Sequence, residues 1–373
     1  MSDPIRELTE LGQSLWYDNI ERRLLENGEL AAMIGAGEIR GMTSNPSIFQ
    51  KAISESEDYD AELGKLAVEG LSTEAIYEAL AVADIRAAAD LFRPVYEDSD
   101  GEDGFISLEV SPLLAHDTEG TFEDARRLWA RVDRPNLMVK IPATDAGLPA
   151  IERSIAAGIN INVTLIFSRE RYQEVMDAYL SGLESRVAKG LPVDRIASVA
   201  SFFVSRIDSK VDGRLENLLR EEGEQAGIVQ ALRGRIAIAN ARLAYQKFRA
   251  VFEGPRFTPL KAAGARVQRP LWASTSTKNP AYPDVLYVEA LIGPDTVNTV
   301  PPATLQAFKD HGRAEATIEK DLEEAEETFS GLEQIEIDFE EVTGELEDEG
   351  VKAFAESYTS LLETVEKRRV ESL

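Results

Sequence analysis

The chain has 373 residues, of which 43% are hydrophobic, and a formal net charge of −27 at pH 7. This length fits one large α/β domain or two ordinary ones. The absence of cysteine excludes disulfides and thiolate chemistry, and only two histidines, His116 and His311, are present for a metal site or a catalytic triad.

The charge and the hydropathy of the chain also restrict which molecules it can bind. Strong acidity argues against binding to a nucleic acid or an anionic membrane. No segment approaches the roughly 18 consecutive apolar residues of a membrane span. The first residues are acidic where a signal peptide would be basic. We therefore expect no membrane partner, no nucleic-acid partner and a cytoplasmic location.

Short apolar runs alternate with longer amphipathic stretches along the chain. After an amphipathic helix at 5–15, the predicted strands occupy residues 15–20, 41–47, 105–110, 137–141, 160–167, 196–204, 269–275 and 285–292. Predicted helices follow nearly all of them, for example at 48–91, 121–132, 147–157 and 169–189. An eightfold alternation is typical of a (β/α)₈ TIM barrel. A doubly wound sheet is the alternative, but no Gly-x-Gly-x-x-Gly phosphate loop follows any strand.

Two segments do not fit into the eight strand–helix units of the predicted barrel. Since no linker divides the chain, residues 1–373 are predicted to form one domain. Residues 208–251 form a long, charged helical stretch, which we interpret as an insert on the barrel exterior. Residues 308–373 are very acidic and carry periodic apolar residues. We expect this extension to end in an amphipathic helix, marked by Phe354 and Tyr358, that packs on the barrel.

The apolar strand at 137–141 contains one ammonium group, Lys140, near its C-terminal end. Burial disfavours the charged form of lysine, so a neutral amine becomes accessible near neutral pH. A neutral amine attacks a carbonyl and forms a Schiff base. The alternative is an ordinary lysine at a strand end whose ammonium reaches water.

Polar residues recur at the predicted C-terminal strand ends, where barrel enzymes place their chemistry. Since side chains alternate along a strand, Thr43 and Asn45 share one face, as do Asn162 and Thr164. Glu109 interrupts an otherwise apolar strand, and Ser274 and Ser276 share a face. Each has a simpler explanation when taken alone: Glu109 as a rim charge, Asn162 as a turn cap, and Asp18 as a helix N-cap.

Four segments together resemble the signature sequences of the transaldolase family. They are Gly-Met-Thr-Ser-Asn-Pro-Ser-Ile-Phe at 41–49, Val-Lys-Ile-Pro-Ala-Thr at 139–144, Gly-Ile-Asn-Ile-Asn-Val-Thr-Leu-Ile-Phe-Ser at 158–168, and Ser-Phe-Phe-Val-Ser-Arg-Ile at 201–207. The resemblance implies a class I aldolase-type barrel that needs no metal and no cofactor. It also implies transfer of dihydroxyacetone from sedoheptulose 7-phosphate to glyceraldehyde 3-phosphate, in the pentose phosphate pathway.

The resemblance assigns a role to each matching position. It implies that Lys140 forms the Schiff base, that Glu109 shuttles protons through a water, and that Asp18 takes the proton during C–C cleavage. Thr164 holds the catalytic water in this comparison. The implied sugar-phosphate-binding residues are Thr43, Asn45, Asn162, Ser201, Phe203, Arg206 and Ser274.

One position departs from the family pattern. Many members carry a second phosphate-binding arginine two residues after Ser274, where this chain has Ser276. Lys278 lies two positions further on and can supply the missing charge.

Three functional hypotheses remain open from the sequence. A fructose 6-phosphate aldolase is the nearest enzymatic alternative to transaldolase, and a barrel that binds without catalysis is the other. The sequence is compatible with either a monomer or a homodimer.

Overall fold

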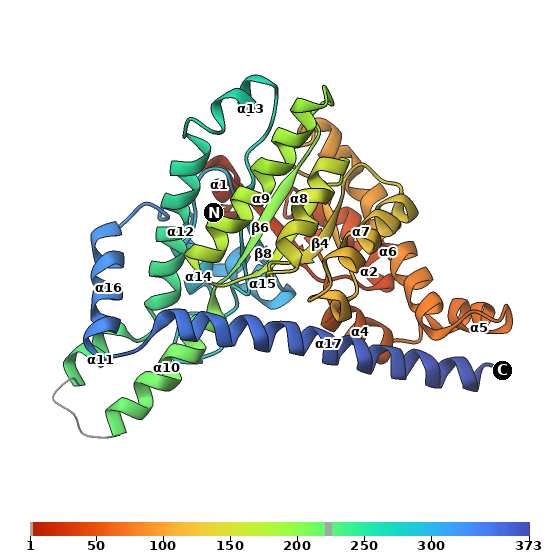
Figure 1. Cartoon of the computed structure of the whole chain (residues 1–373). Helices are drawn as coiled ribbons and strands as arrows, with labels where there is room; N and C mark the ends of the chain where they lie inside the picture. Colours follow the sequence, from red (N-terminus) through yellow and green to blue (C-terminus); the bar gives the residue numbers. More distant parts are fainter. Residues whose placement is uncertain (1–2, 221–225) are drawn as a thin grey trace.

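Eight parallel strands close into a barrel in which each strand pairs with its neighbours in chain order (Figure 1). This computed structural model describes residues 3–220 and 226–373. The strands are β1 (Gln13–Asp18), β2 (Gly41–Thr43), β3 (Ile106–Glu109), β4 (Leu137–Pro142), β5 (Ile161–Ile166), β6 (Ser198–Phe203), β7 (Arg269–Ala273) and β8 (Thr296–Val300). The predicted (β/α)₈ TIM barrel is confirmed.

Helices surround the barrel and connect its strands. The shorter ones are α1 (Pro4–Glu10), α2 (Arg22–Glu26), α3 (Glu29–Gly35), α5 (Asp60–Val68), α11 (Ala226–Leu232), α13 (Thr258–Ala262), α14 (Leu286–Ala290) and the 3₁₀ turn η1 (Pro112–Leu114). The longer ones are α4 (Pro46–Glu55), α6 (Thr73–Asp98), α7 (Thr118–Val132), α8 (Gly147–Ala157), α9 (Arg169–Ala188), α10 (Ser205–Arg220), α12 (Ile236–Phe252), α15 (Pro302–His311), α16 (Leu322–Gln334) and α17 (Phe339–Glu371).

Side-chain caps explain several helix starts. Asp3 accepts the backbone N–H groups of Ile5 and Arg6 at 3.2 Å, so α1 begins at the predicted Asp-Pro step. Ser72 caps α6 through the N–H of Ala75, so the helical stretch predicted at 48–91 is interrupted before a new helix begins at Thr73.

The predicted last strand at 285–292 was wrong, because this segment forms α14. Its buried residues Tyr287, Val288, Leu291 and Ile292 recur at helical spacing, a period that the apolar run concealed. The eighth strand is instead Thr296–Val300, where Asp295 with φ 56° precedes it and Pro301 follows. The first predicted helix at 5–15 was also too long, since β1 already begins at Gln13.

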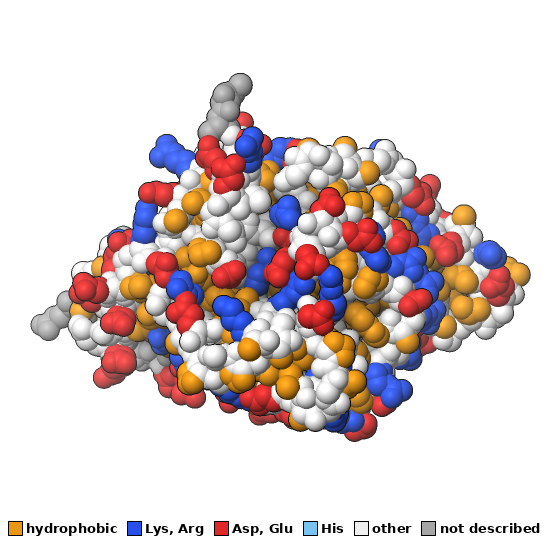
Figure 2. Space-filling model, turned by 90° about the horizontal axis from the view of Figure 1, so that it is seen from above, with side chains coloured by type: hydrophobic (Ala, Val, Ile, Leu, Met, Phe, Trp, Pro, Cys, Tyr) orange, Lys and Arg blue, Asp and Glu red, His pale blue; other side chains and the backbone are white. Residues whose placement is uncertain are grey.

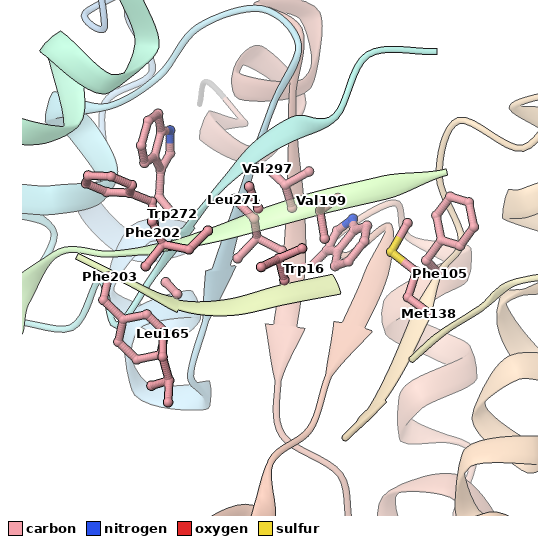
Figure 3. Close-up of a cluster of buried hydrophobic side chains, with 14 of the residues drawn as sticks. Trp16, Phe105, Met138, Leu165, Val199, Phe202, Phe203, Leu271, Trp272 and Val297 are labelled. Carbon is pink, nitrogen blue, oxygen red and sulfur yellow. The ribbon is translucent and has the colours of Figure 1, made fainter. Parts of the chain in front are cut away.

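A buried apolar layer fills the barrel below its C-terminal ends. Trp16, Met138, Val199, Leu271 and Val297 lie together in Figure 3, and each is at most 1% exposed. Side chains at the alternate strand positions point outward, and one of them, Phe202, packs edge-on against Tyr172 of α9. Gly41 belongs to this packing, since a Cβ there would lie 2.6 Å from the Trp16 ring.

At the opposite end of the barrel, Asp103 connects several strands. Its buried carboxylate accepts hydrogen bonds from Ser14, from Trp16 Nε1 at 2.8 Å and from Arg40 Nε at 2.8 Å, and it pairs with Arg269 at 3.4 Å. Because β1 and β7 both contribute partners, this carboxylate ties non-neighbouring strands together.

We expect Asp103→Ala to lower the free energy of unfolding by about 3 kcal/mol, because it leaves buried donors and a buried arginine without their anion. Urea denaturation followed by circular dichroism measures this change. Asp98→Ala, at the exposed end of α6, is the control and should change stability by less than about 0.5 kcal/mol. Equal effects of the two substitutions would contradict a structural role for Asp103.

Helix α17 runs along the C-terminal mouth of the barrel as one continuous helix of 33 residues (Figure 1). Near one end, Lys210 and Arg214 of α10 pair with Glu345 at 2.7 and 2.9 Å. Near its other end, Arg368 pairs with Asp60 of α5 at 2.9 Å. The helix approaches the barrel closely at Gly350, where a Cβ would lie 2.9 Å from a methyl carbon of Leu165.

The surface carries both charge signs despite the net charge of −27. Figure 2 shows acidic and basic side chains interspersed over one whole face, with hydrophobic side chains among them. Within residues 3–220 and 226–373, no helix is long and apolar enough to span a bilayer.

Candidate active site

The C-terminal mouth of the barrel contains a cavity of about 220 Å³, which we call the mouth cavity. Strands β1, β2, β4, β5, β6, β7 and β8 each contribute to it, and α17 covers it. Its lining residues are Asp18, Thr43, Asn45, Lys140, Thr164, Ser201, Phe203, Arg206, Ala273, Ser274, Ser276, Lys278, Thr299, Pro301 and Phe354.

Lys140 occupies a confined position in this cavity. The residue is 4% exposed, and its Nζ donates a hydrogen bond to the backbone oxygen of Ser44 at 3.2 Å. Nζ lies 3.5 Å from Oε2 of Glu109 on the adjacent strand and 5.6 Å from the centre of the Phe354 ring. The amine therefore has one carboxylate beside it and an aromatic ring over it, and it is almost inaccessible to bulk solvent.

Glu109 has an environment suited to proton exchange near neutral pH. Burial raises the pKa of Glu109 to about 7, although the charge and hydrogen bonding of Lys140 oppose the shift. Its side chain is 5% exposed, and Oε2 accepts no hydrogen bond of regular geometry from the described residues, its nearest cation being Lys140 Nζ at 3.5 Å. A buried polar atom of this kind usually binds a water molecule or a reacting group.

Asp18 lies across the cavity from this pair and is held by threonine hydroxyls. Thr43 Oγ1 donates to Asp18 Oδ1 at 2.6 Å and lies 2.6 Å from Thr299 Oγ1. Burial raises the pKa of Asp18, whereas the bond from Thr43 and the charges of Lys140 and Lys278 lower it. The carboxylate is thereby fixed in place and can accept a proton from a bound molecule.

A chain of hydrogen bonds supports the floor of the cavity. Ser201 Oγ donates to Asn162 Oδ1 at 2.7 Å, and Asn162 Nδ2 donates to Ser107 Oγ at 2.9 Å. Asn162 is fully buried and does not line the mouth cavity, unlike its neighbour Thr164. Thr164 Oγ1 is buried without a hydrogen-bond partner among the described residues, so it has a donor and an acceptor site free for water.

Two cations define one end of the cavity. Arg206 is the second residue of α10, and its guanidinium lies 5.1 Å from the centre of the Phe203 ring. Lys278 Nζ donates to Ser276 Oγ at 2.7 Å. Burial lowers the pKa of both cations, and Arg206 lowers that of Lys278 further. Two partly buried cations that influence each other, one of them in the first turn of α10, suit a phosphate group.

Backbone strain accompanies this site. Leu165 and Ser274 are non-glycine residues with φ of 61° and 55°, at the ends of β5 and β7. Both positions are costly for a residue with a Cβ, and such strain concentrates at functional sites. The irregular register of β5 between Val163 and Ile166 redirects Leu165 toward Gly350 of α17, and Figure 3 shows Leu165 beside Phe203. Ser274 Oγ lies 3.0 Å from Ser205 Oγ at the start of α10.

The structure gathers most of the residues singled out from the sequence. Asp18, Thr43, Asn45, Lys140, Thr164, Ser201, Phe203, Arg206, Ser274, Ser276 and Lys278 line the mouth cavity, whereas Glu109 and Asn162 lie next to it. Asn45 also caps α4 by accepting the N–H of Ile48 at 2.9 Å.

Sequence reasoning missed Thr299 and assigned Phe354 only to helix packing. Thr299 lies in β8, whereas the sequence pattern favoured a last strand at 285–292. The signal that could have identified it is the enrichment of β-branched residues in Thr296-Val-Asn-Thr-Val300, directly before two prolines. No local pattern could show that Phe354 would reach Lys140.

A buried lysine beside a glutamate, facing an aspartate at the C-terminal mouth of a (β/α)₈ barrel, defines the class I aldolase type of enzyme. The chain matches the model of the family described as Transaldolase/Fructose-6-phosphate aldolase over residues 15–365, and it belongs to that family. Relatives named Transaldolase come from Parafrankia sp. strain EAN1pec (50% identity over 99% of this chain and 98% of the relative), Trichodesmium erythraeum (47%, 99% and 98%) and Thermobifida fusca (50%, 98% and 98%).

Proposed function

We propose that this transaldolase-type enzyme moves a dihydroxyacetone unit from sedoheptulose 7-phosphate to glyceraldehyde 3-phosphate, yielding erythrose 4-phosphate and fructose 6-phosphate. The position of the Lys140 amine, between Glu109 and the Phe354 ring and near Asp18, carries this proposal. The relatives' shared name favours transaldolase over fructose 6-phosphate aldolase. We also propose a cytoplasmic location and a monomeric or homodimeric state.

The first steps join the donor to the enzyme. Lys140 Nζ attacks C2 of the ketose, and the C2 oxygen leaves as water once it has gained protons through Glu109 and a water that Thr164 holds. The product is a protonated imine, which acts as the electron sink for the next step. Glu109 suits this exchange because its pKa of about 7 lets it give and take protons near neutrality.

Cleavage and transfer then follow. Asp18 takes the proton of the C4 hydroxyl as the C3–C4 bond breaks, and that bond's electrons enter the imine to give an enamine. The aldose phosphate leaves, and the enamine carbon attacks the aldehyde of the acceptor while Asp18 returns the proton. A final water releases the new ketose and regenerates the amine of Lys140.

The decisive test is borohydride reduction with fructose 6-phosphate, followed by peptide mass mapping. We expect one adduct on the peptide that contains Lys140 and none on the peptide that contains Lys278. A coupled assay with and without glyceraldehyde 3-phosphate separates the two activities, because a transaldolase needs the acceptor and an aldolase does not. The absence of an adduct, or acceptor-independent turnover, would contradict the proposal.

A further prediction concerns the departure at Ser276. If Lys278 provides the second phosphate cation, Lys278→Gln should raise the KM for fructose 6-phosphate by about 10- to 100-fold and change kcat little, since it removes one charge-assisted contact of about 1.5–3 kcal/mol. Lys320→Gln, at an exposed lysine paired with Glu315, is the matched control. Equal KM values for both variants would show that Lys278 does not bind the phosphate.

A further inference from the structure

We propose that a second cavity, separate from the mouth cavity, is the route by which water reaches and leaves Glu109 during imine formation and hydrolysis. This side cavity has a volume of about 360 Å³ and lies between the ends of β2 and β3, helices α6 and α7, and Tyr358 of α17. The inference rests on the proposed function, because it concerns the water that imine chemistry releases and consumes.

Glu109 lies at the junction of the two cavities. It lines the side cavity, while its Oε2 is 3.5 Å from Lys140 Nζ, which lines the mouth cavity. Asn45 lines both cavities. Oε2 is buried and, apart from Lys140 Nζ at 3.5 Å, has no polar partner among the described residues, so a water arriving from the side cavity would find acceptor capacity there.

The side cavity is large enough and polar enough for a chain of waters. A cavity of about 10–15 Å³ is already enough to hold one water molecule. Side chains that can hydrogen-bond to water line it, among them Ser111, Tyr77, Glu74 and Tyr358. At the outer end, the side chains of Arg127 and Arg131 are 49% and 39% exposed, so the cavity reaches the solvent.

The charges of the side cavity make it unsuitable for a sugar phosphate. Glu74, Glu78 and Asp124 line it together with Glu109, and the two arginines are already engaged by Glu78. Arg127 also pairs with Asp124 at 2.5 Å. A phosphate dianion would meet more negative than positive charge, whereas water is not excluded.

Imine chemistry has to move water to and from the active site. When Nζ bonds to C2, the C2 oxygen takes two protons and departs as one water molecule, and hydrolysis later consumes one water. At both moments a sugar phosphate fills the mouth cavity of about 220 Å³ beneath α17. Water that passes on the Glu109 side avoids displacing the sugar.

A matched pair of alanines on α6 tests the proposal. Ala75 lines the side cavity, and Ala79, one turn further on and also half-buried, lies outside the set of lining residues. We expect Ala75→Phe to lower kcat about tenfold and to change KM by less than about twofold. A tenfold loss is a part of the roughly 10²–10⁴-fold that a positioned acid or base such as Glu109 supplies. Ala79→Phe should match the wild type.

The direct readout is the incorporation of ¹⁸O from labelled water into C2 of fructose 6-phosphate, without acceptor, with Lys140→Met as the blank. Each cycle of imine formation and hydrolysis exchanges this oxygen. The expected result is exchange about tenfold slower in Ala75→Phe than in Ala79→Phe. Equal exchange rates in two folded variants would overturn the water route, whereas wild-type exchange no faster than the blank would instead overturn the Schiff-base function.

If Ala75→Phe does not fold, as judged by its thermal transition, Ala81→Val replaces it. Ala81 lines the side cavity and is 1% exposed, so two added carbons narrow the cavity with less disturbance. Slower exchange in Ala81→Val than in Ala79→Phe supports the route, and equal exchange refutes it.

Discussion

Replacing Lys140 by methionine is expected to reduce transaldolase turnover by a factor on the order of 10⁴ or more, because no imine can form and the reaction loses its electron sink. Methionine fills nearly the same volume as the lysine stem, so the barrel should fold. Turnover is measured in a coupled assay that follows erythrose 4-phosphate, and adduct formation by borohydride trapping.

Lys65→Met is the control, since Lys65 pairs only with Glu69 among the described ion pairs and its side chain on α5 is 74% exposed. It should retain wild-type turnover and adduct formation. Substantial turnover by folded Lys140→Met would refute the assignment of the nucleophile and with it the mechanism.

Glu109→Gln should lower kcat by about 10²–10⁴-fold, since glutamine keeps the shape of glutamate and cannot exchange a proton. It should also change the pH profile. With the pKa of Glu109 at about 7, the carboxyl is protonated below that pH and cannot take a proton from the amine of Lys140. The wild-type kcat/KM should therefore rise with pH through about 7, because kcat/KM reports ionisations of the free enzyme.

In Glu109→Gln this rise near pH 7 should be absent, while the residual activity remains dependent on Lys140. Glu102→Gln, at the opposite end of the barrel, serves as the control and should keep the wild-type profile. A Glu109→Gln enzyme that retains both its rate and its rise near pH 7 would show that another group moves the proton.

The alternation of side chains along a strand is what made most of the site predictable. Once Lys140 faces inward, its register neighbours Glu109 and Asn162 must face inward as well, and Asp18 pairs with Thr43 in the same way. Since parallel strands of a barrel end at the same rim, the polar residues at those ends had to converge.

Other features depend on tertiary packing and left no local trace. The helix pattern of α17 predicts an apolar face, yet it does not say that this face covers the mouth of the barrel or that Phe354 lies over Lys140. Thr299 was missed because the apolar run at 285–292 attracted the strand assignment, although its buried residues recur at helical spacing. Asn162 also differs from expectation, since Ser107 and Ser201 engage its side chain below the mouth cavity.

The anchoring of α17 at both ends determines how molecules can enter. Helix α17 is held to α10 by ion pairs near one end and to α5 by Arg368 near the other. It cannot move away from the barrel as a hinged lid without breaking the ion pairs at both ends. We therefore expect passage of a sugar to depend on movement of side chains at the mouth, such as the Phe354 ring, rather than on the microsecond-to-millisecond excursion of a hinged lid. In this enzyme, the side chains at the mouth cavity rearrange to admit the sugar, while helix α17 stays in place.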